Sequence, residues 1–304
     1  MRITFVKTLT EFAKKNQKVV LLTGDLGFSI FEGFIQSCPN QFMNAGVAEQ
    51  NMTGMAAGLA SEGKIPVIYS IIPFVTMRNF EQIRNDVCYQ NLNVKIVGVG
   101  AGFSYGPYGH THHALEDIGI LRTLANMTIF CPGDPVEVQK TTDAMLELTG
   151  PTYLRLGKAG EPVIHTDGID FQIGKGIVIT EGTDLTLFAT STMVYRAQEV
   201  AKQLQSKNIS VRLVSIPTIK PFDEELVRTC VTETKKIFTL EEHSVIGGLG
   251  SAVAEVIAEY GKPVIFKRIG VPDRFTKVIG KQEYMRRANK LECDQIVDTI
   301  LTSL

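Results

Sequence analysis

The stretch "MTIFCPGDPVEVQKTTDAMLELTGPTYLRLG" (residues 127–157) decides the fold class. Its first residues, "MTIFCPGD", form a short apolar run that Pro132 and Gly133 stop, which predicts a buried strand. The next residues, "PVEVQKTTDAMLEL", predict a helix, because proline is favoured in a first helical turn. "GPTYLRLG" predicts another strand. Strands that alternate with helices favour a parallel sheet covered on both faces.

The same alternation continues toward both ends of the chain. Upstream, strands are predicted at "VVLLTGD", "IPVIYSII" and "NVKIVGVG", and one apolar face of a first helix is predicted at Ile3, Val6, Leu9, Phe12 and Ala13. Downstream, the turn-rich residues 157–176 are the candidate linker. A second run then predicts strands at "DLTLFAT", "VRLVSI", "KIFTLEE" and "VIFKRIG", with helices between them. We therefore predict an α/β fold of two doubly wound domains, residues 1–165 and 170–304.

The amino-acid composition indicates which partners to expect and in which cell compartment the protein works. The chain has 304 residues, 44% of them hydrophobic, which is enough for roughly two domains. A formal charge of -1 gives no general attraction to nucleic acid or membranes, so we expect neither as a partner. The cysteines follow no metal spacing and are expected to be reduced thiols of a cytoplasmic protein. No apolar run approaches the roughly 20 residues of a membrane span.

A single carboxylate stands out in "NAGVAEQNMTGMAAGLAS" (residues 44–61). The segment predicts a helix from Glu49 onward, whose small residues permit close approach of another backbone. Glu49 lies in the first turn, where the helix dipole favours negative charge. It either faces water or is buried, and a buried carboxylate must be paired or hydrogen-bonded. The residues alone leave both alternatives open.

Several ordered blocks cover nearly the whole chain: "GVAEQNMTGMAAGLASEGKIPVIYS", "FEQIRNDVCYQNLNVKIVG", "THHALEDIGILRTLANMTIFCPGDPVE", "GPTYLRLGK" and "EEHSVIGGLGSAVAE". They resemble the pyrimidine-binding and C-terminal domains of transketolases, and are most similar to the C-terminal subunits of split transketolases. The resemblance implies that the larger domain binds the pyrimidine of thiamine diphosphate and that the smaller one is a transketolase C-terminal domain.

The resemblance also implies a cofactor site. Glu49 matches the catalytic glutamate that hydrogen-bonds the cofactor ring nitrogen N1′ and shares a proton with it. Phe74 falls in the aromatic cluster that faces the pyrimidine, although it also reads as an ordinary core residue. Ile71 stands where transketolases often have a second phenylalanine, which makes it a further cofactor-binding candidate.

Candidate substrate ligands follow from the same resemblance. His112 matches the histidine that points at the reacting oxygen of the substrate, so it is both a catalytic and a substrate-binding candidate. His110 and Tyr108 in the same segment, and Arg155 in "YLRLG", are further substrate-binding candidates, and Arg2 is a second candidate for a phosphate. Read alone, "HTHH" also invites a zinc site, but Ala114 stands where an aspartate is needed, so we predict no metal ligand in this chain.

Three residues depart from the family pattern. Gly24 replaces a phosphate-contacting serine, Gly100 replaces a phosphate-contacting histidine, and Tyr108 replaces the aspartate that reads a sugar hydroxyl. We therefore expect a modified or nucleotide-linked sugar as the substrate.

Half of the cofactor site has no counterpart in this sequence. Thiamine diphosphate needs Mg2+ or Ca2+, which the family holds with a GDG motif and a later asparagine, and this chain has only "TGDLG". The resemblance thus implies an N-terminal, diphosphate-binding partner subunit that supplies the metal ligands, in an α2β2 assembly. The helix after Glu49 is a candidate part of that interface.

The predicted function is transfer of a two-carbon ketol unit from a ketose to an aldose acceptor, with the partner present. The alternatives are a 2-oxo acid dehydrogenase β-type or deoxyxylulose phosphate synthase-like subunit, and a noncatalytic scaffold subunit. A nucleotide-binding oxidoreductase is disfavoured, because no G-x-G-x-x-G follows the first strand of either domain.

Overall fold

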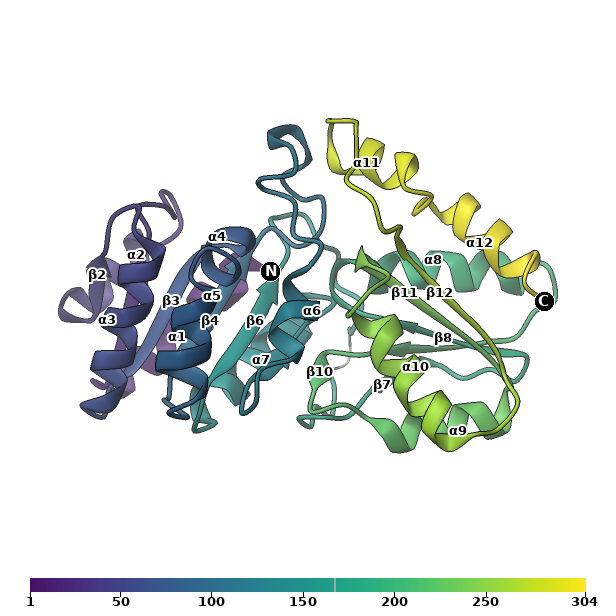
Figure 1. Cartoon of the computed structure of the whole chain (residues 1–304), viewed down its shortest axis with the longest axis horizontal. Helices are drawn as coiled ribbons and strands as arrows, with labels where there is room; N and C mark the ends of the chain where they lie inside the picture. The colour runs from purple at the N-terminus through teal and green to yellow at the C-terminus, as the bar shows by residue number, and fades with distance from the viewer. Residues whose placement is uncertain (167) are drawn as a thin grey trace.

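A computed structural model describes residues 1–166 and 168–304, and it contains two β-sheets that lie side by side with helices around each (Figure 1). Among the described residues, no helix is both long enough and apolar enough to cross a membrane.

The first sheet has seven strands in the order β10-β5-β6-β4-β3-β1-β2. All neighbours are parallel except β10, which pairs antiparallel with β5. Strands β3, β4 and β6 are almost wholly buried, as expected of a parallel sheet covered on both faces. The bounds are β1 (Val19–Thr23), β2 (Phe42–Asn44), β3 (Ile65–Ile71), β4 (Lys95–Val99), β5 (Thr128–Phe130), β6 (Thr152–Leu156) and β10 (Thr218–Lys220).

Helices cover both faces of the first sheet. One apolar cluster joins the sheet to α1 (Arg2–Lys15), α2 (Glu32–Ser37) and α7 (Pro135–Glu147). The other cluster joins it to α3 (Glu49–Ser61), the π-helix η2 (Ile83–Cys88) and α6 (Asp117–Arg122). The short helical elements are η1 (Pro39–Gln41), α4 (Ile72–Thr76), α5 (Phe80–Gln82) and η3 (Gly106–Tyr108).

The predicted buried face of the first helix was wrong at one position. Ile3 is 78% exposed, whereas Phe5 is fully buried beside Val6 and Leu9. Helix α1 packs against α7, and Phe5 stacks with Tyr69 of β3. The buried face of α1 therefore includes Phe5, which packs on Tyr69 of the sheet, and excludes Ile3.

The second sheet has five strands in the order β12-β11-β8-β9-β7. Strand β7 is antiparallel to β9, and the other neighbours are parallel. The strands are β7 (Ile177–Thr180), β8 (Leu185–Ala189), β9 (Val211–Ser215), β11 (Lys236–Ser244) and β12 (Ile265–Val271). The helices are η4 (Ser191–Met193), α8 (Val194–Gln205), α9 (Glu224–Glu233), α10 (Leu249–Tyr260), α11 (Gln282–Ala288) and α12 (Cys293–Leu301).

The two halves share structure across their boundary. Strand β10 comes from the second half of the sequence, yet it forms the edge of the first sheet. One apolar cluster contains Ile118 and Leu121 of α6 together with Phe188 of β8 and Val253 of α10. The predicted parallel sheets are confirmed, and the exceptions are two edge strands, β10 and β7, which are short and pair in the antiparallel direction.

One lysine of the first sheet is fully buried. The Lys95 ammonium donates to the carbonyl oxygens of Leu148 and Gly150, at 2.6 and 3.0 Å, where α7 ends. Burial lowers the pKa of Lys95 to about 7. Since the unfolded chain has a lysine pKa near 10.4, it binds more protons than the folded chain between these values, and stability rises with pH across that window.

We expect the wild type to gain roughly 2 kcal/mol of unfolding free energy between pH 7 and pH 9 relative to Lys95→Met. Urea titrations at both pH values measure this difference. The exposed Lys64→Met is the control and should follow the wild type. Parallel pH dependence of wild type and Lys95→Met would contradict the assignment.

Candidate active site

Glu49 is the first residue of α3 and is only 1% exposed. Its Oε1 accepts a hydrogen bond from the Ser70 hydroxyl at 3.3 Å, and its Oε2 accepts one from Arg78 Nη1 at 2.7 Å. A β-carbon on Gly24 would come within 3.4 Å of Oε1, so the glycine leaves room beside the carboxylate. Of the two alternatives for this carboxylate, the structure has the buried and paired one.

Arg78 joins Glu49 to Phe74, and neither the composition nor the spacing arguments had named it. Its guanidinium carbon lies 4.2 Å from the centroid of the Phe74 ring, and its side chain is 44% exposed. Phe74 lies in α4 and Arg78 follows four residues later. The i, i+4 spacing of an aromatic and an arginine was the available signal, because such side chains meet on a helical turn.

His112 comes to the same place from a different segment. Its ring centroid lies 5.0 Å from that of Phe74 and 5.1 Å from that of Tyr108. Thr111 Oγ1 lies 3.0 Å from His112 Nδ1. Burial and the nearby Arg78 charge both lower the pKa of His112, so the neutral imidazole is favoured at pH 7.

Basic side chains gather beside these rings. Tyr105 lies 6.3 Å from His112 between ring centroids, and the Lys158 ammonium lies 4.8 Å from the Tyr105 centroid. Arg2 donates from Nε to the Lys158 carbonyl oxygen. A β-carbon on Gly100 would overlap the Tyr105 ring, so this tyrosine needs the glycine. Sequence reasoning missed Lys158, although it follows directly on the strand that was singled out for Arg155.

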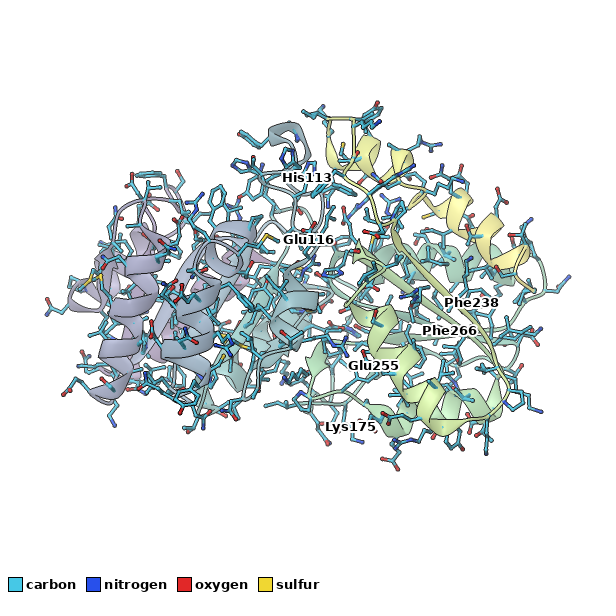
Figure 2. All side chains as sticks on the ribbon, in the orientation of Figure 1. His113, Glu116, Lys175, Phe238, Glu255 and Phe266 are labelled. Carbon is cyan, nitrogen blue, oxygen red and sulfur yellow. The ribbon has the colours of Figure 1, made fainter. Side chains whose placement is uncertain are left out.

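Two further sequence candidates have other neighbours. His110 packs near Phe275, with ring centroids 6.0 Å apart, and lines a cavity of about 300 Å³ at the boundary of the two halves. Figure 2 labels two residues of its lining, His113 and Glu116, with His113 above Glu116 in this view. Ile71 ends β3 and packs against the apolar cluster that contains α1 and α7.

Arg155 also lies elsewhere, and its placement does not support a phosphate contact. It is 1% exposed and forms an ion pair with the fully buried Asp117, with Nε 2.8 Å from Oδ2. Nη2 donates to the carbonyl oxygens of Ala114 and Glu242 and Nη1 to Ser191 Oγ. Its guanidinium thus joins both halves of the chain, and Arg155 is not proposed as a substrate ligand.

The backbone N–H groups at the glycine-rich start of α10 are bonded to a carboxylate of the same chain. Glu241 accepts hydrogen bonds from the backbone N–H groups of Leu249 and Gly250, at 2.7 and 2.8 Å. Burial raises the pKa of Glu241 to about 7. The helix terminus that could have cradled an external anion is therefore occupied by this carboxyl group.

Within residues 1–166 and 168–304, one group of side chains has the spacing of a metal site, and it lies away from Glu49. It consists of Asp134, Glu137 and His165. Asp134 already accepts three backbone N–H bonds, and Glu137 accepts one from Gly133 and contacts His165 Nε2 at 2.8 Å. These contacts hold residues 164 and 165 against the start of α7.

Comparison with known proteins supplies two matches that together span most of the chain. Residues 1–160 match the family model described as "Transketolase, pyrimidine binding domain". Residues 174–296 match the one described as "Transketolase, C-terminal domain".

Similar curated proteins point the same way. An apulose-4-phosphate transketolase subunit of Actinobacillus succinogenes is 40% identical over 269 residues, 88% of this chain and 86% of that protein. A 6-deoxy-6-sulfo-D-fructose transketolase subunit of a Clostridium species is 38% identical over 298 residues, 98% and 92% of the two chains. A 1-deoxy-D-xylulose-5-phosphate synthase of Shouchella clausii is 34% identical over 304 residues, 99% of this chain and 48% of the synthase.

A solved structure is also similar over its whole length. It is titled a split gene transketolase in an inactive β4 tetramer, with a TM-score of 0.92 and 38% identity. The similarity covers 100% of this chain and 97% of that one.

Proposed function

This chain belongs to the transketolase family as a separate subunit of the C-terminal type, and on that premise we propose that it forms the pyrimidine-binding half of a thiamine-diphosphate-dependent ketol transferase. The enzyme moves a two-carbon ketol unit from a ketose to an aldose acceptor in the cytoplasm. The active site lies between this chain and an N-terminal partner in an α2β2 heterotetramer. The buried Glu49 carboxylate, which faces a planar cation on an aromatic ring, carries the proposal.

The surroundings of Glu49 fit an aminopyrimidine. The Arg78 guanidinium is planar, donates an N–H bond to Glu49 Oε2 and lies on the Phe74 ring. An aminopyrimidine is also planar, carries nitrogen donors and packs on aromatic faces. The same carboxylate and ring therefore suit either group. When bound, thiamine diphosphate supplies the carbon nucleophile that carries the two-carbon unit.

The side chains of this chain have distinct roles in the proposal. Glu49 would form the hydrogen bond with the ring nitrogen and share one proton with it, while Ser70 keeps the other carboxylate oxygen in place. Phe74 supports the ring. His112, held near Phe74 in its neutral form, forms a hydrogen bond with the reacting oxygen of the substrate and assists proton transfer there.

Arg78 must leave Glu49 before an aminopyrimidine can bind. Arg78→Met removes this competitor, and we expect thiamine diphosphate to bind the assembled enzyme roughly fivefold more tightly, since a partly exposed ion pair is worth up to about 1 kcal/mol. Isothermal calorimetry with Mg2+ measures the change. Arg84→Met, on the neighbouring η2, is the matched control and should leave the affinity unchanged. Weaker binding in Arg78→Met would mean that Arg78 contacts the cofactor instead.

We propose that the partner supplies the Mg2+ or Ca2+ ligands and docks on the exposed face of α3. Gly54 and Gly58 lie on this face, and a β-carbon on either would meet no atom of this chain within 4 Å. Packing within the chain therefore gives no reason for glycine, which costs a helix about 1 kcal/mol relative to alanine. Close approach of another subunit does give one.

Gly54→Leu is expected to weaken association with the partner at least tenfold, because the side chain fills the surface that the partner approaches. The isolated variant should melt at the wild-type temperature or slightly above it. Analytical ultracentrifugation of the mixed subunits measures association. Gln203→Leu adds the same side chain to the exposed face of α8 and should assemble normally. Normal assembly of Gly54→Leu would remove α3 from the interface.

The basic groups beside Tyr105 favour an anionic sugar as the substrate. Arg2 and Lys158 come together there, and Arg78 is near enough to His112 for its charge to lower the histidine pKa. Relatives are named for a phosphorylated and a sulfonated sugar. We propose a modified sugar with a phosphate, a sulfonate or a nucleotide-linked group, and cations at these positions attract each of them.

The test of the function uses the chain assembled with its proposed N-terminal, diphosphate-binding partner. Calorimetry should detect thiamine diphosphate with Mg2+ for the pair, and β-hydroxypyruvate should serve as the ketol donor to an aldose phosphate. Turnover of pyruvate instead would favour the deoxyxylulose phosphate synthase-like or 2-oxo acid dehydrogenase alternative. A pair that binds no cofactor would leave the scaffold role.

A further inference from the structure

The loop that carries His112, residues 103–113, is anchored in the second half of the chain. Gly102 and Ala114 close its base by exchanging two backbone hydrogen bonds. Phe103, the first residue of the loop, and Leu115, which follows it closely, are buried in the apolar core of the second sheet together with Leu187 of β8. In Figure 1 this loop and α11 stand at the same end of the two sheets. The position of His112 therefore depends on the domain that does not hold Glu49.

Glu242 of β11 makes the central polar contact of this anchor. It is 1% exposed, and its Oε1 accepts the backbone N–H of Phe103 at 3.0 Å. The carboxylate also accepts bonds from Thr192 Oγ1 at 2.9 Å and from Arg286 Nη2 at 2.7 Å. Burial alone would raise the pKa of Glu242, but the Arg286 charge and the hydrogen bonds lower it below its ordinary value. One ionised side chain thus ties the loop to η4 and α11.

Gln282 of α11 adds a second link. Its Nε2 donates to Ser104 Oγ at 3.4 Å and to both oxygens of Glu242, at 3.2 and 3.1 Å. The loop lies close against the turn that precedes α11, since a β-carbon on Gly106 would overlap the Gly280 carbonyl oxygen. A β-carbon on Gly102 would likewise overlap Glu242 Cγ. These glycines let the loop touch its anchor directly.

We propose that Glu242, assisted by Gln282, is a positioning residue for His112: it fixes the first peptide of the loop and so holds the imidazole beside Phe74. The inference rests on the role proposed above for His112. A misplacement of about 1 Å can lower a catalytic rate roughly 100-fold, so a fixed loop has a direct kinetic value. Cofactor binding at Glu49 does not depend on these contacts, because Glu49, Ser70 and Phe74 belong to other segments.

Two variants test the proposal in the enzyme assembled with its partner. Glu242→Gln keeps the shape and removes the charge, and Gln282→Ala removes the second link at a half-buried, neutral position. Both should lower kcat with β-hydroxypyruvate, about tenfold to 100-fold for Glu242→Gln and less for Gln282→Ala. The Kd for thiamine diphosphate should change less than twofold. Gln295→Ala, in the neighbouring α12, is the matched control for Gln282→Ala.

Two further readouts separate positioning from general stability. Amide exchange across residues 103–113 in the chain alone should become at least tenfold faster in both variants, whether or not the chain binds cofactor. In a His112→Asn background, Gln282→Ala should have no further effect on kcat.

Several outcomes would overturn the positioning role. These are wild-type kcat in Gln282→Ala, a loss of kcat that adds fully to that of His112→Asn, and a parallel loss of cofactor binding. If Glu242→Gln does not fold, Gln282→Ala decides the matter. Faster exchange in both variants, together with a wild-type pair that binds no cofactor, would mean that the loop anchor exists and that the proposed function is wrong.

Discussion

Glu49→Gln is expected to lower turnover of the assembled enzyme by roughly 10²- to 10⁴-fold, the range that positioned proton transfer contributes. The amide fills the same space and can still bond to Ser70, but it cannot share a proton with a ring nitrogen. The loss should appear in kcat and in cofactor affinity together. Steady-state kinetics with β-hydroxypyruvate and calorimetry with thiamine diphosphate measure the two.

The matched control for this prediction lies at the end of the same helix. Glu62 is the exposed C-cap residue of α3, so Glu62→Gln removes a charge without changing the contacts of Glu49 with Ser70 and Arg78. It should retain wild-type kinetics and melting temperature. Full activity of Glu49→Gln in the assembled enzyme would rule out the catalytic role and favour a scaffold subunit.

Arg155→Met is expected to destabilise the folded chain by about 3–5 kcal/mol, because it leaves the buried Asp117 carboxylate without its counter-charge. In the wild type, burial alone would raise the pKa of Asp117, but Arg155 outweighs this effect and lowers it. Stability from this carboxylate is therefore present at neutral pH and is lost as the pH falls through the lowered pKa. Urea unfolding at pH 7 measures the change.

Two comparisons make the Arg155 prediction specific. Arg228→Met breaks an exposed ion pair with Glu224 and should cost less than about 0.5 kcal/mol. Arg155→Met combined with Asp117→Leu should recover much of the lost stability, since an apolar pair replaces a buried ionic one. If Arg155 instead held a substrate phosphate, Arg155→Met would raise KM and leave unfolding unchanged.

Most of the fold follows from local patterns, and the parts that do not are short. The apolar runs that become β3, β4 and β8 lie where the sequence predicts them, since buried parallel strands are apolar throughout. Strand β10 spans only Thr218–Lys220, too few residues for any periodic pattern. Its pairing with β5 depends on contacts between the two halves, which local patterns do not contain.

The candidate site divides in the same way. Glu49, Phe74 and His112 come together in the structure, and it was family resemblance that named them. Arg155 lies elsewhere, paired with Asp117, whereas His110 and Ile71 stay predictions. An arginine inside the wholly buried run "TYLRL" does predict a counter-charge, but only the tertiary fold identifies it as Asp117. Arg78 was within reach of the helical spacing rule and was missed, because carboxylates and histidines are the more usual catalytic groups.

The second half of the sequence contributes β10 to the first sheet, and this affects limited proteolysis of the protein. A protease cut in the turn-rich residues 157–176 would leave two fragments that still share a seven-stranded sheet and one apolar core. Neither fragment could be prepared alone without exposing a bare sheet edge at β5 and the apolar side of α6, which invites aggregation. We therefore expect the two fragments to stay associated after the chain is cleaved between the halves.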